Sequence, residues 1–470
     1  MRFKDQLRSL FATSVVWRGL TSATRKLSAF FAAGKLWQWM TGADEGRQVG
    51  WLTRFIDSKF CDFFRSSTLL GWLTAVPELP WLCLMLTGLS ALLMPTLVVM
   101  LLSLVTFVLT VMAVIFRKEK LPLINSGVAA WALFALVTLA FTLCNYGGLK
   151  GVLAGGIRFC MLPSLPSAWI LLSKAGRVKK TALVFTAGVA AVGLYGLYQY
   201  FAGAMSSLWT DTEMFSEDFG RLTSTFENPN VYGTFLLLGL PIALVSLLTA
   251  KRKRERLFYA LTSAVALINF VLTYSRGCYV SMVLILFILL LCYGRNWLWA
   301  GVGALAAMPF CLPESVLQRV MSIGNLADTS VSYRISIWEG ALKMLEHCWW
   351  SGVGIGDTAF VAVYDYTALD AIEAPHAHNL LLQTICESGV LGLIALIALF
   401  VCLFRTAMSS TCRESGQIKW WRLALIACWS GLLVQGLTDY IFYNNNLFVI
   451  MLISMGAMIA QPKEEGNYAE

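Results

Sequence analysis

Residues 81–116, WLCLMLTGLSALLMPTLVVMLLSLVTFVLTVMAVIF, form a run of 36 residues without a single charged side chain. A helix that crosses a bilayer needs about 20 apolar residues, so this run is too long for one span and suits two short ones. Pro95 lies within the run and cannot continue a helix without distorting it. We therefore predict two membrane-spanning helices, at 79–95 and 96–116.

The composition of the whole chain extends this prediction. Of its 470 residues, 58% are hydrophobic and only 13% are charged, whereas soluble domains carry roughly 45–50% apolar and about 25% charged residues. This composition excludes a soluble enzyme, a disordered protein and a fibrous protein. The predicted fold class is an all-α polytopic membrane protein with about twelve transmembrane helices and one long, partly helical extracytoplasmic loop. The ten further predicted spans are 121–144, 152–172, 181–203, 231–250, 257–274, 279–294, 297–312, 388–404, 422–438 and 446–461.

The distribution of basic residues predicts the orientation. With the N-terminus inside, the cytoplasmic segments hold 29 of the 36 lysines and arginines, as the positive-inside rule requires. Both termini are therefore expected in the cytoplasm, and the membrane is expected to be the bacterial plasma (inner) membrane. The net charge of +9 needs no nucleic acid partner. The other basic residues are Lys150, Arg158, Arg221, Arg276, Arg319, Arg334 and Lys343.

Five regions follow from these spans. Residues 1–78 are a basic leader, expected to lie as amphipathic helices on the cytoplasmic face or to be poorly ordered. Helices occupy 79–312 and 388–461, an extracytoplasmic loop occupies 313–387, and 462–470 form a cytoplasmic tail.

Two features are expected inside the long loop. Apolar residues at helical spacing predict a helix over residues 332–346. The glycine run 352–356 does not follow a strand in a βαβ unit, so a nucleotide loop is excluded and a tight, exposed turn is expected.

Two arginines on the outer side are candidates for binding phosphate. Arg276 lies between two spans at the membrane edge, where its charge needs an anionic partner or must snorkel to water. Arg221 shortly precedes Asn228-Pro229-Asn230, a sequence that can form a turn and cap the next helix. Two guanidinium groups at one depth can hold a diphosphate through bidentate hydrogen bonds.

Histidine supplies the candidate base. His378 lies in Pro375-His-Ala-His-Asn379, where the long loop returns to the membrane, and neutral histidine is a competent general base near pH 7. His376 is an alternative base. A cluster of acidic and histidine residues also suggests a metal site. It comprises Asp365, Asp370, Glu373, His376 and His378. Its spacing matches no known ligand pattern, so we predict no metal.

Five short motifs together resemble the bacterial O-antigen ligase and O-antigen polymerase superfamily. They occur in the family's order over roughly residues 180–460, on a scaffold of twelve predicted spans. Each motif is weak alone. They are Arg221 with Phe226-x-Asn228-Pro229-Asn230, Ser275-Arg276-Gly277, Arg334-x-x-x-Trp338, Gly352-Val353-Gly354-x-Gly356, and His378-Asn379 followed by Gly389-x-x-Gly392.

The resemblance implies a function. Members of the superfamily move a glycan from a polyprenyl diphosphate carrier to an acceptor sugar on the non-cytoplasmic face, without a cofactor or metal. By position, His378 matches the catalytic histidine, and Arg221 and Arg276 match the arginines that bind the diphosphate. Arg334, Asn379, His376 and Asn230 are expected to support them. The implied partners are a polyprenyl diphosphate-linked glycan, a glycan or lipid acceptor and the bilayer.

The chemistry of these residues agrees with that implication. A diphosphate is already a good leaving group, so it needs charge stabilisation, which guanidinium groups supply. The acceptor hydroxyl needs a base, for which His378 is expected. No nucleophilic carboxylate pairs with an acid, so a single displacement that inverts the anomeric carbon is expected.

Three alternatives stay open. A polymerase would use the same donor and extend another lipid-linked glycan, and the motifs do not separate it from a ligase. A transporter of lipid-linked sugars would need charges deep in several spans, and Arg158 is nearly the only one. A transferase that uses polyprenyl monophosphate sugars would need acidic residues in the first outer loop, which has none. Asp357 and Asp365 remain candidates for the outer-loop carboxylate on which related cell-shape polymerases depend.

Overall fold

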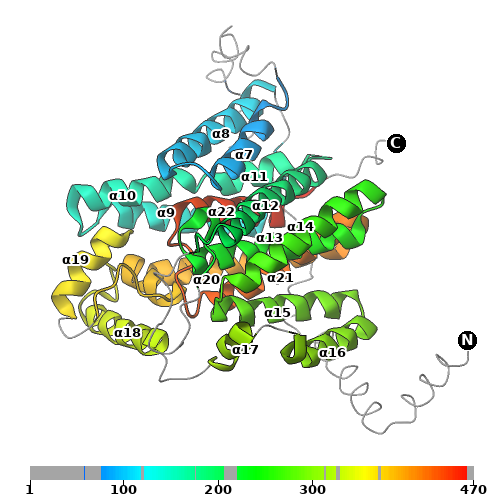
Figure 1. Cartoon of the computed structure of the whole chain (residues 1–470). Helices are drawn as coiled ribbons and strands as arrows, with labels where there is room; N and C mark the ends of the chain where they lie inside the picture. Colours follow the sequence, from blue (N-terminus) through cyan, green and yellow to red (C-terminus); the bar gives the residue numbers. More distant parts are fainter. Residues whose placement is uncertain are drawn as a thin grey trace, which may run out of the picture.

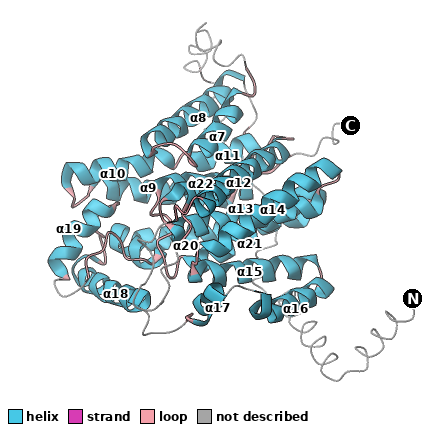
Figure 2. Ribbon diagram, viewed as in Figure 1, coloured by secondary structure: helices cyan, strands magenta, loops and turns pink. Residues whose placement is uncertain are grey.

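The computed structural model shows a bundle of helices (Figures 1 and 2), and no strand occurs among the residues that it describes. The all-α fold class is confirmed in this part of the chain. The predicted leader and tail lie outside it, apart from residues 58, 76–78 and 462. The described residues are 58, 76–117, 121–174, 176–205, 220–311, 314–323, 329–368 and 372–462.

The first two helices confirm the predicted break at Pro95. Helix α7 spans Leu79–Ser90 and α8 spans Thr96–Arg117, with a turn between them. The two helices pack together, and the hydroxyl groups of Thr87 and Thr106 are hydrogen-bonded at 2.9 Å. The long apolar run is therefore a helical hairpin.

Every other predicted span also coincides with a helix. Within the described ranges, eight helical segments are long and apolar enough to cross a membrane, and α7 and α22 are apolar but shorter. The number of twelve spans therefore stays a prediction. The helices up to the long loop are α9 (Ser126–Leu143), α10 (Gly148–Met161), α11 (Ser164–Leu172), α12 (Arg177–Phe201), α13 (Pro229–Thr249), α14 (Lys253–Leu272), α15 (Arg276–Tyr293) and α16 (Arg295–Cys311).

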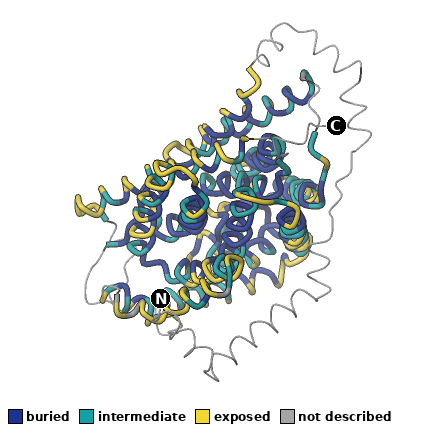
Figure 3. The backbone as a smooth tube through the Cα atoms, turned by 90° about the vertical axis from the view of Figure 1, so that its right-hand side faces the viewer, coloured by how far each residue is buried: buried dark blue, intermediate teal, exposed yellow. Residues whose placement is uncertain are grey.

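The core of the bundle surrounds α13, α21 (Gly416–Gln435) and α22 (Asn445–Ile459), which are buried along most of their length (Figure 3). Helices α12, α14, α15 and α21 all pack against α13. Glycine permits close crossings here. A Cβ added at Gly456 would come within 2.4 Å of the Leu165 carbonyl oxygen, so α22 touches the α11 backbone directly.

The long loop folds into what we call the cap, comprising α17 (Glu314–Met321), α18 (Thr329–Cys348), α19 (Asp357–Thr367) and residues 372–388. Helix α18 confirms the helix predicted at 332–346. The cap has a hydrophobic cluster of its own, distinct from the core of the bundle. Its largest members are Ile337, Met344, Leu345, Phe360 and Tyr364.

The return from the cap to the membrane differs from the expectation. Helix α20 spans Leu380–Arg413 and so begins eight residues before the predicted start at 388. At Gly389 its backbone has φ 59° and ψ −169°, which breaks the helix at the membrane boundary. A Cβ added at Gly389 would lie 2.0 Å from the Trp350 carbonyl oxygen, so a larger residue does not fit there. The first part of α20 therefore belongs to the cap and the second part to the bundle.

The expected exposed turn at 352–356 is wrong, because these residues are buried. Gly352 and Gly354 have positive φ angles of 63° and 101°, and added side chains would collide with the backbone of Glu387 and with Asn145. The Val353 carbonyl accepts a hydrogen bond from the amide of Tyr146 at 2.9 Å. The glycines thus let the cap dock closely onto the end of the bundle.

Candidate functional site

His378 lies in a loop that is held tightly from both sides. Its φ angle is 44°, a left-handed conformation that is uncommon outside glycine. The preceding residue, Ala377, donates its amide to Gln383 at 2.7 Å and accepts the Trp338 indole at 3.0 Å. The amide of His378 donates to Nδ1 of His376 at 3.2 Å. Contacts from α18 and α20 therefore fix a strained backbone, which is typical of functional sites.

A carboxylate missed in the sequence analysis faces this histidine. Nδ1 of His378 lies 3.2 Å from Oδ1 of Asp439, in the loop between α21 and α22. Burial would raise the pKa of Asp439, but the hydrogen bond from His378 and the charge of Arg334 lower it to about 2. The carboxylate is thus ionised and favours the tautomer with hydrogen on Nδ1. Nε2 then carries the lone pair that a base needs.

His376 lies in a different environment, although it is only two residues away. It is 5% exposed, and its ring packs against Tyr443 with centroids 4.3 Å apart. Burial, together with the nearby charge of His378, lowers its pKa to about 3. His376 is therefore neutral at pH 7 and a weak base.

Asn379 joins the His378 loop to the Asp439 loop. Its side-chain oxygen caps α20 by accepting from the amides of Leu381 and Leu382, both at 3.0 Å. Its amide nitrogen donates to the Leu437 carbonyl at 2.8 Å. Since Leu437 is two residues from Asp439, this predicted supporting residue brings the histidine and the carboxylate together.

Arg221 is buried at the entrance to α13 and is 6% exposed. Its guanidinium donates to the Thr273 carbonyl at 2.9 Å and to Oδ1 of Asn230 at 3.0 Å. Ser275 donates to that same oxygen at 2.9 Å. Asn230 therefore orients Arg221, while the helix-capping role anticipated for this turn is performed by Asn228.

Arg276 and Arg334 meet at the start of α18. The Arg276 guanidinium donates to the hydroxyl of Ser322 at 3.1 Å and to that of Ser330. Arg334 donates to the Ser330 carbonyl at 3.2 Å, while its buried Nε has no hydrogen-bond partner in the described part of the chain. Because the side chain of Arg276 is held by the cap, simple snorkelling does not describe it.

Three outer arginines, Arg221, Arg319 and Arg334, lie close enough to interact electrostatically. Burial and the charges of Arg319 and Arg334 lower the pKa of Arg221 to about 9. Arg319, which was not among the predicted site residues, is 7% exposed and donates to the Tyr274 carbonyl at 3.2 Å. Arg334 also acts on Asp439, so it lies between the arginines and the His378–Asp439 pair. An anion would relieve this mutual repulsion.

A buried ion pair contacts the loop that carries Asp439. Arg158 of α10 lies 3.3 Å from Glu387 of α20, and both contact the Tyr440 hydroxyl, at 2.9 and 3.1 Å. Arg158 also holds Asn445 and the Tyr443 carbonyl. The network thus connects the membrane bundle, the cap and the loop that carries Asp439.

The described residues that could hold a metal ion overlap only in part with those expected. His376, His378 and Asp439 are the described residues whose ligand atoms gather within 4.8 Å of one another. Asp365 and Glu373 do not join them, and Asp370 lies outside the described residues. The positive charges of Arg158 and Arg334 act on His376. They would oppose a divalent cation at this place.

Part of the chain is similar to a known family. The family model of the O-antigen ligases matches residues 261–397. This segment therefore resembles an O-antigen ligase domain. The resemblance to the O-antigen ligase and polymerase superfamily is thereby confirmed. No curated protein matches the chain.

The O-antigen ligase domain contributes only part of the site. Arg276, Arg334 and His378 lie inside it, whereas Arg221 and Asp439 lie outside. Members of this family are glycan ligases and polymerases that act on lipid-linked glycans, and the apolar helices agree with a bacterial membrane protein. Over residues 261–397 the chain is thus similar to a family of enzymes of this broad class.

Proposed function

We propose that the protein transfers an oligo- or polysaccharide from a polyprenyl diphosphate carrier to an acceptor hydroxyl on the extracytoplasmic face. The observation that carries this proposal is the His378–Asp439 pair beside a cluster of arginines. A base and an anion-binding surface are the two parts that such a transfer needs.

His378 acts as the general base. Its Nδ1–H donates to the Asp439 carboxylate, which stabilises the imidazolium that forms. The acceptor hydroxyl loses its proton to Nε2 while its oxygen bonds to the anomeric carbon. His376 is buried with a depressed pKa, which supports His378 as the base of the two.

The arginines bind the leaving group. As the new bond forms, the bond between the anomeric carbon and the diphosphate oxygen breaks, and the carrier leaves with the electron pair. Arg221 and Arg276 hold the diphosphate, and Arg334 adds a third cation. Such preorganised charge stabilises the transition state strongly. A single displacement of this kind inverts the anomeric configuration.

The reaction as proposed uses no metal and no cofactor. Cations around His376 and His378 support this part of the proposal, since they already supply positive charge where a metal would. The site lies at the end of the bundle opposite its basic clusters. The positive-inside rule then puts it outside the plasma membrane, with both termini in the cytoplasm.

A polymerase remains the second candidate, because it needs the same base and the same donor. Transport of a lipid-linked sugar is less well supported. Arg158, which lies within a predicted span, is held by Glu387, Tyr440 and Asn445 in a fixed network. It is placed to support the fold of the site.

The test is product analysis with purified protein and a polyprenyl diphosphate oligosaccharide in EDTA. We expect transfer by the wild type and a loss of 10²–10⁴-fold in His378→Ala, the range that general bases contribute. His347→Ala is the matched control, since His347 is exposed on α18. Growth of the donor glycan without added acceptor would identify a polymerase.

Two results would contradict the proposal. Full activity in His378→Ala would remove the base from the mechanism. Activity that appears only with an added divalent ion would point to a metal at His376, His378 and Asp439.

A further inference from the structure

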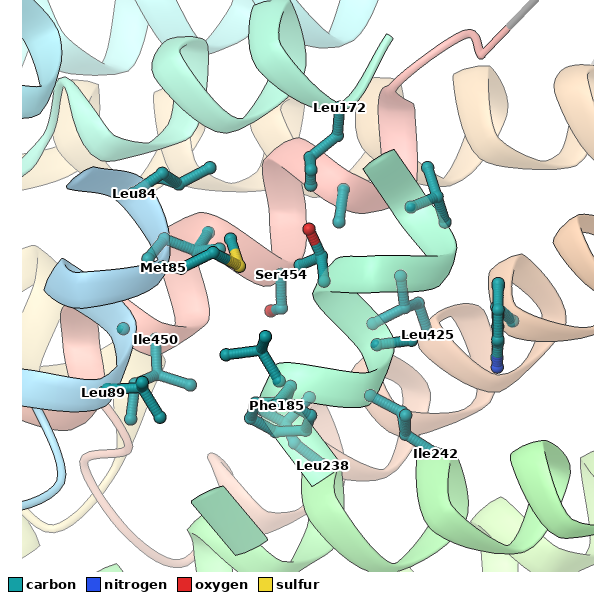
Figure 4. A pocket seen from close by; sticks show the side chains of 18 of the residues that line it. Leu84, Met85, Leu89, Leu172, Phe185, Leu238, Ile242, Leu425, Ile450 and Ser454 are labelled. Atoms are coloured by element: carbon teal, nitrogen blue, oxygen red, sulfur yellow. The ribbon is translucent and has the colours of Figure 1, made fainter. Parts of the chain in front are cut away.

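An apolar cavity lies within the bundle, away from the candidate site (Figure 4). Its volume is about 110 Å³, and its walls come from α7, α11, α12, α13, α21 and α22. Aliphatic and aromatic side chains line it almost completely. Those labelled in Figure 4 include Leu84, Phe185, Leu238, Leu425 and Ile450.

The cavity is separated from the candidate site by much of the length of a helix. Leu425 in its wall and Gln435 at the end of α21 are ten residues apart, or about 15 Å along the helix axis. Asp439 lies beyond that end. The cavity is therefore a separate feature, nearer the end of the bundle where the basic residues gather.

The few polar groups in the wall already have partners. The Ser454 hydroxyl accepts from the Trp429 indole at 3.1 Å and donates to the Met451 carbonyl at 2.7 Å. The Thr181 hydroxyl accepts from the Trp81 indole at 3.0 Å. A bound water needs two to four polar partners, so this cavity suits an apolar occupant instead.

A second hollow adjoins the apolar cavity. Its volume is about 290 Å³, and the two share Val178 and Trp421 in their walls. The hollow is lined by Lys179 and by the polar residues Ser415 and Gln417, together with the apolar residues Ile418 and Pro462. The apolar cavity thus adjoins a hollow that carries a cation.

The cation of the hollow is available for exchange. Lys179 is 55% exposed and lies 3.5 Å from the Glu255 carboxylate. An exposed ion pair of this kind contributes little stability, so an anionic ligand can compete for the lysine. Lys180 is close by and lies 5.9 Å above the Trp81 ring.

One residue in the wall of the apolar cavity reaches the surface of the bundle. Leu89 of α7 lines the cavity and is 37% exposed, on a helix whose outward residues are all apolar. A molecule can therefore enter from the bilayer. An acyl chain meets this requirement, and a phosphate head would reach Lys179.

We propose that the two hollows together bind an anionic phospholipid. A segment of its acyl chain fills the apolar cavity, and its phosphate group contacts Lys179. With the orientation derived above, the ligand belongs to the cytoplasmic leaflet. This site is independent of the glycan chemistry.

The experiment fills the cavity and measures lipid retention. A Cβ added at Gly88 meets only Ile453, at 3.8 Å, so Gly88→Leu would extend a side chain into the cavity. Gly303→Leu is the matched control, because Gly303 lies on α16 with nothing within 4 Å of an added Cβ. Purified proteins are incubated with phosphatidylglycerol, phosphatidylcholine or a polyprenyl diphosphate, and bound lipid is counted by native mass spectrometry.

We expect Gly88→Leu to weaken phosphatidylglycerol binding roughly tenfold, or about 1.4 kcal/mol. Gly303→Leu should bind like the wild type. Lys179→Ala should lose the preference for phosphatidylglycerol over phosphatidylcholine while keeping the apolar contact. Thermal unfolding of each variant shows that it is folded.

Three outcomes would overturn the proposal. One is equal retention of phosphatidylglycerol by the wild type and Gly88→Leu. Another is an unchanged lipid preference in Lys179→Ala. The third is a loss in Gly88→Leu of polyprenyl diphosphate and not of phospholipid, which would assign the cavity to the carrier chain.

Discussion

Buried arginines occur at both ends of the bundle, but their contacts differ. At the basic end, Arg422 is 3% exposed and donates to the Glu414 carboxylate at 2.8 Å and to the Ala460 carbonyl at 2.6 Å. Arg177 is 4% exposed and contacts Glu78 at 3.1 Å. These arginines are neutralised by carboxylates, and they tie chain segments together.

At the other end, the contacts described for Arg221 and Arg276 are with amide, hydroxyl and carbonyl oxygens. Such oxygens orient a guanidinium group without cancelling its charge. The same residue type therefore serves two purposes. Arg422 and Arg177 stabilise the fold, while Arg221 and Arg276 are the residues that we propose to bind the diphosphate.

The largest expected effect on the transfer rate comes from a variant that impairs the base and leaves the arginines unchanged. Asp439→Asn should reduce the transfer rate by up to about 10⁴-fold, because the amide favours the wrong tautomer of His378. The rate is measured with the polyprenyl diphosphate donor. Asp357→Asn is the control, since Asp357 is exposed on α19. A greater loss in Asp357→Asn would favour the mechanism of the cell-shape polymerases.

The comparison of arginines itself is tested by one variant at each end. Arg276→Lys should lower the transfer rate about 10²-fold, since lysine cannot form the bidentate contact. Its melting temperature should barely change. Arg422→Gln should instead destabilise the protein by about 3 kcal/mol, because the partly buried carboxylate of Glu414 loses its partner. Thermal unfolding and the transfer assay are run on both, and similar results for the two would remove the distinction.

Glu387 sharpens the comparison, because it is a carboxylate at the site end. Glu387→Gln should lower the free energy of unfolding by about 2–3 kcal/mol, since Arg158 would keep its charge without the ion pair. The double variant Arg158→Met with Glu387→Leu should recover part of this loss. Thermal unfolding measures both, and an unchanged stability in Glu387→Gln would mean that the ion pair is unimportant.

The last prediction concerns the stability of the protein at acidic pH. The pKa of His376 is about 3 in the folded protein and roughly 6.5 in an unfolded chain. Between these values the unfolded state binds more protons, so stability falls as the pH decreases. At pH 4.5 the loss should be at most about 2.7 kcal/mol. Thermal unfolding at pH 7 and 4.5 should show a smaller loss in His376→Gln than in the wild type.

Most of the helices were predictable, because a bilayer imposes a length and an apolarity that are visible in one sequence. The break at Pro95 was found for this reason, whereas the helix at 332–346 was found from the helical spacing of its apolar residues. The count of spans was less certain, because α7 and α22 are short and α21 is buried inside the bundle.

The candidate site was only partly predictable. Arg221, Arg276 and His378 were found from local motifs. Asp439 was missed, because its closeness to His378 depends on how α20 and α21 meet, which no local pattern contains. The assignment of residues 439–445 to the outer side would have singled it out. The buried glycines at 352–356 were misjudged, because their role is a contact with Glu387 and Asn145.

The position of Asp439 also bears on how the protein is made. The ribosome completes Arg221 and His378 before it reaches the loop between α21 and α22, so the carboxylate is the last of these groups to be synthesised. A nascent chain with all earlier helices inserted would still hold His378 without its partner. The enzyme should therefore become competent only when α21 and α22 have entered the membrane, which delays glycan transfer until both are in place.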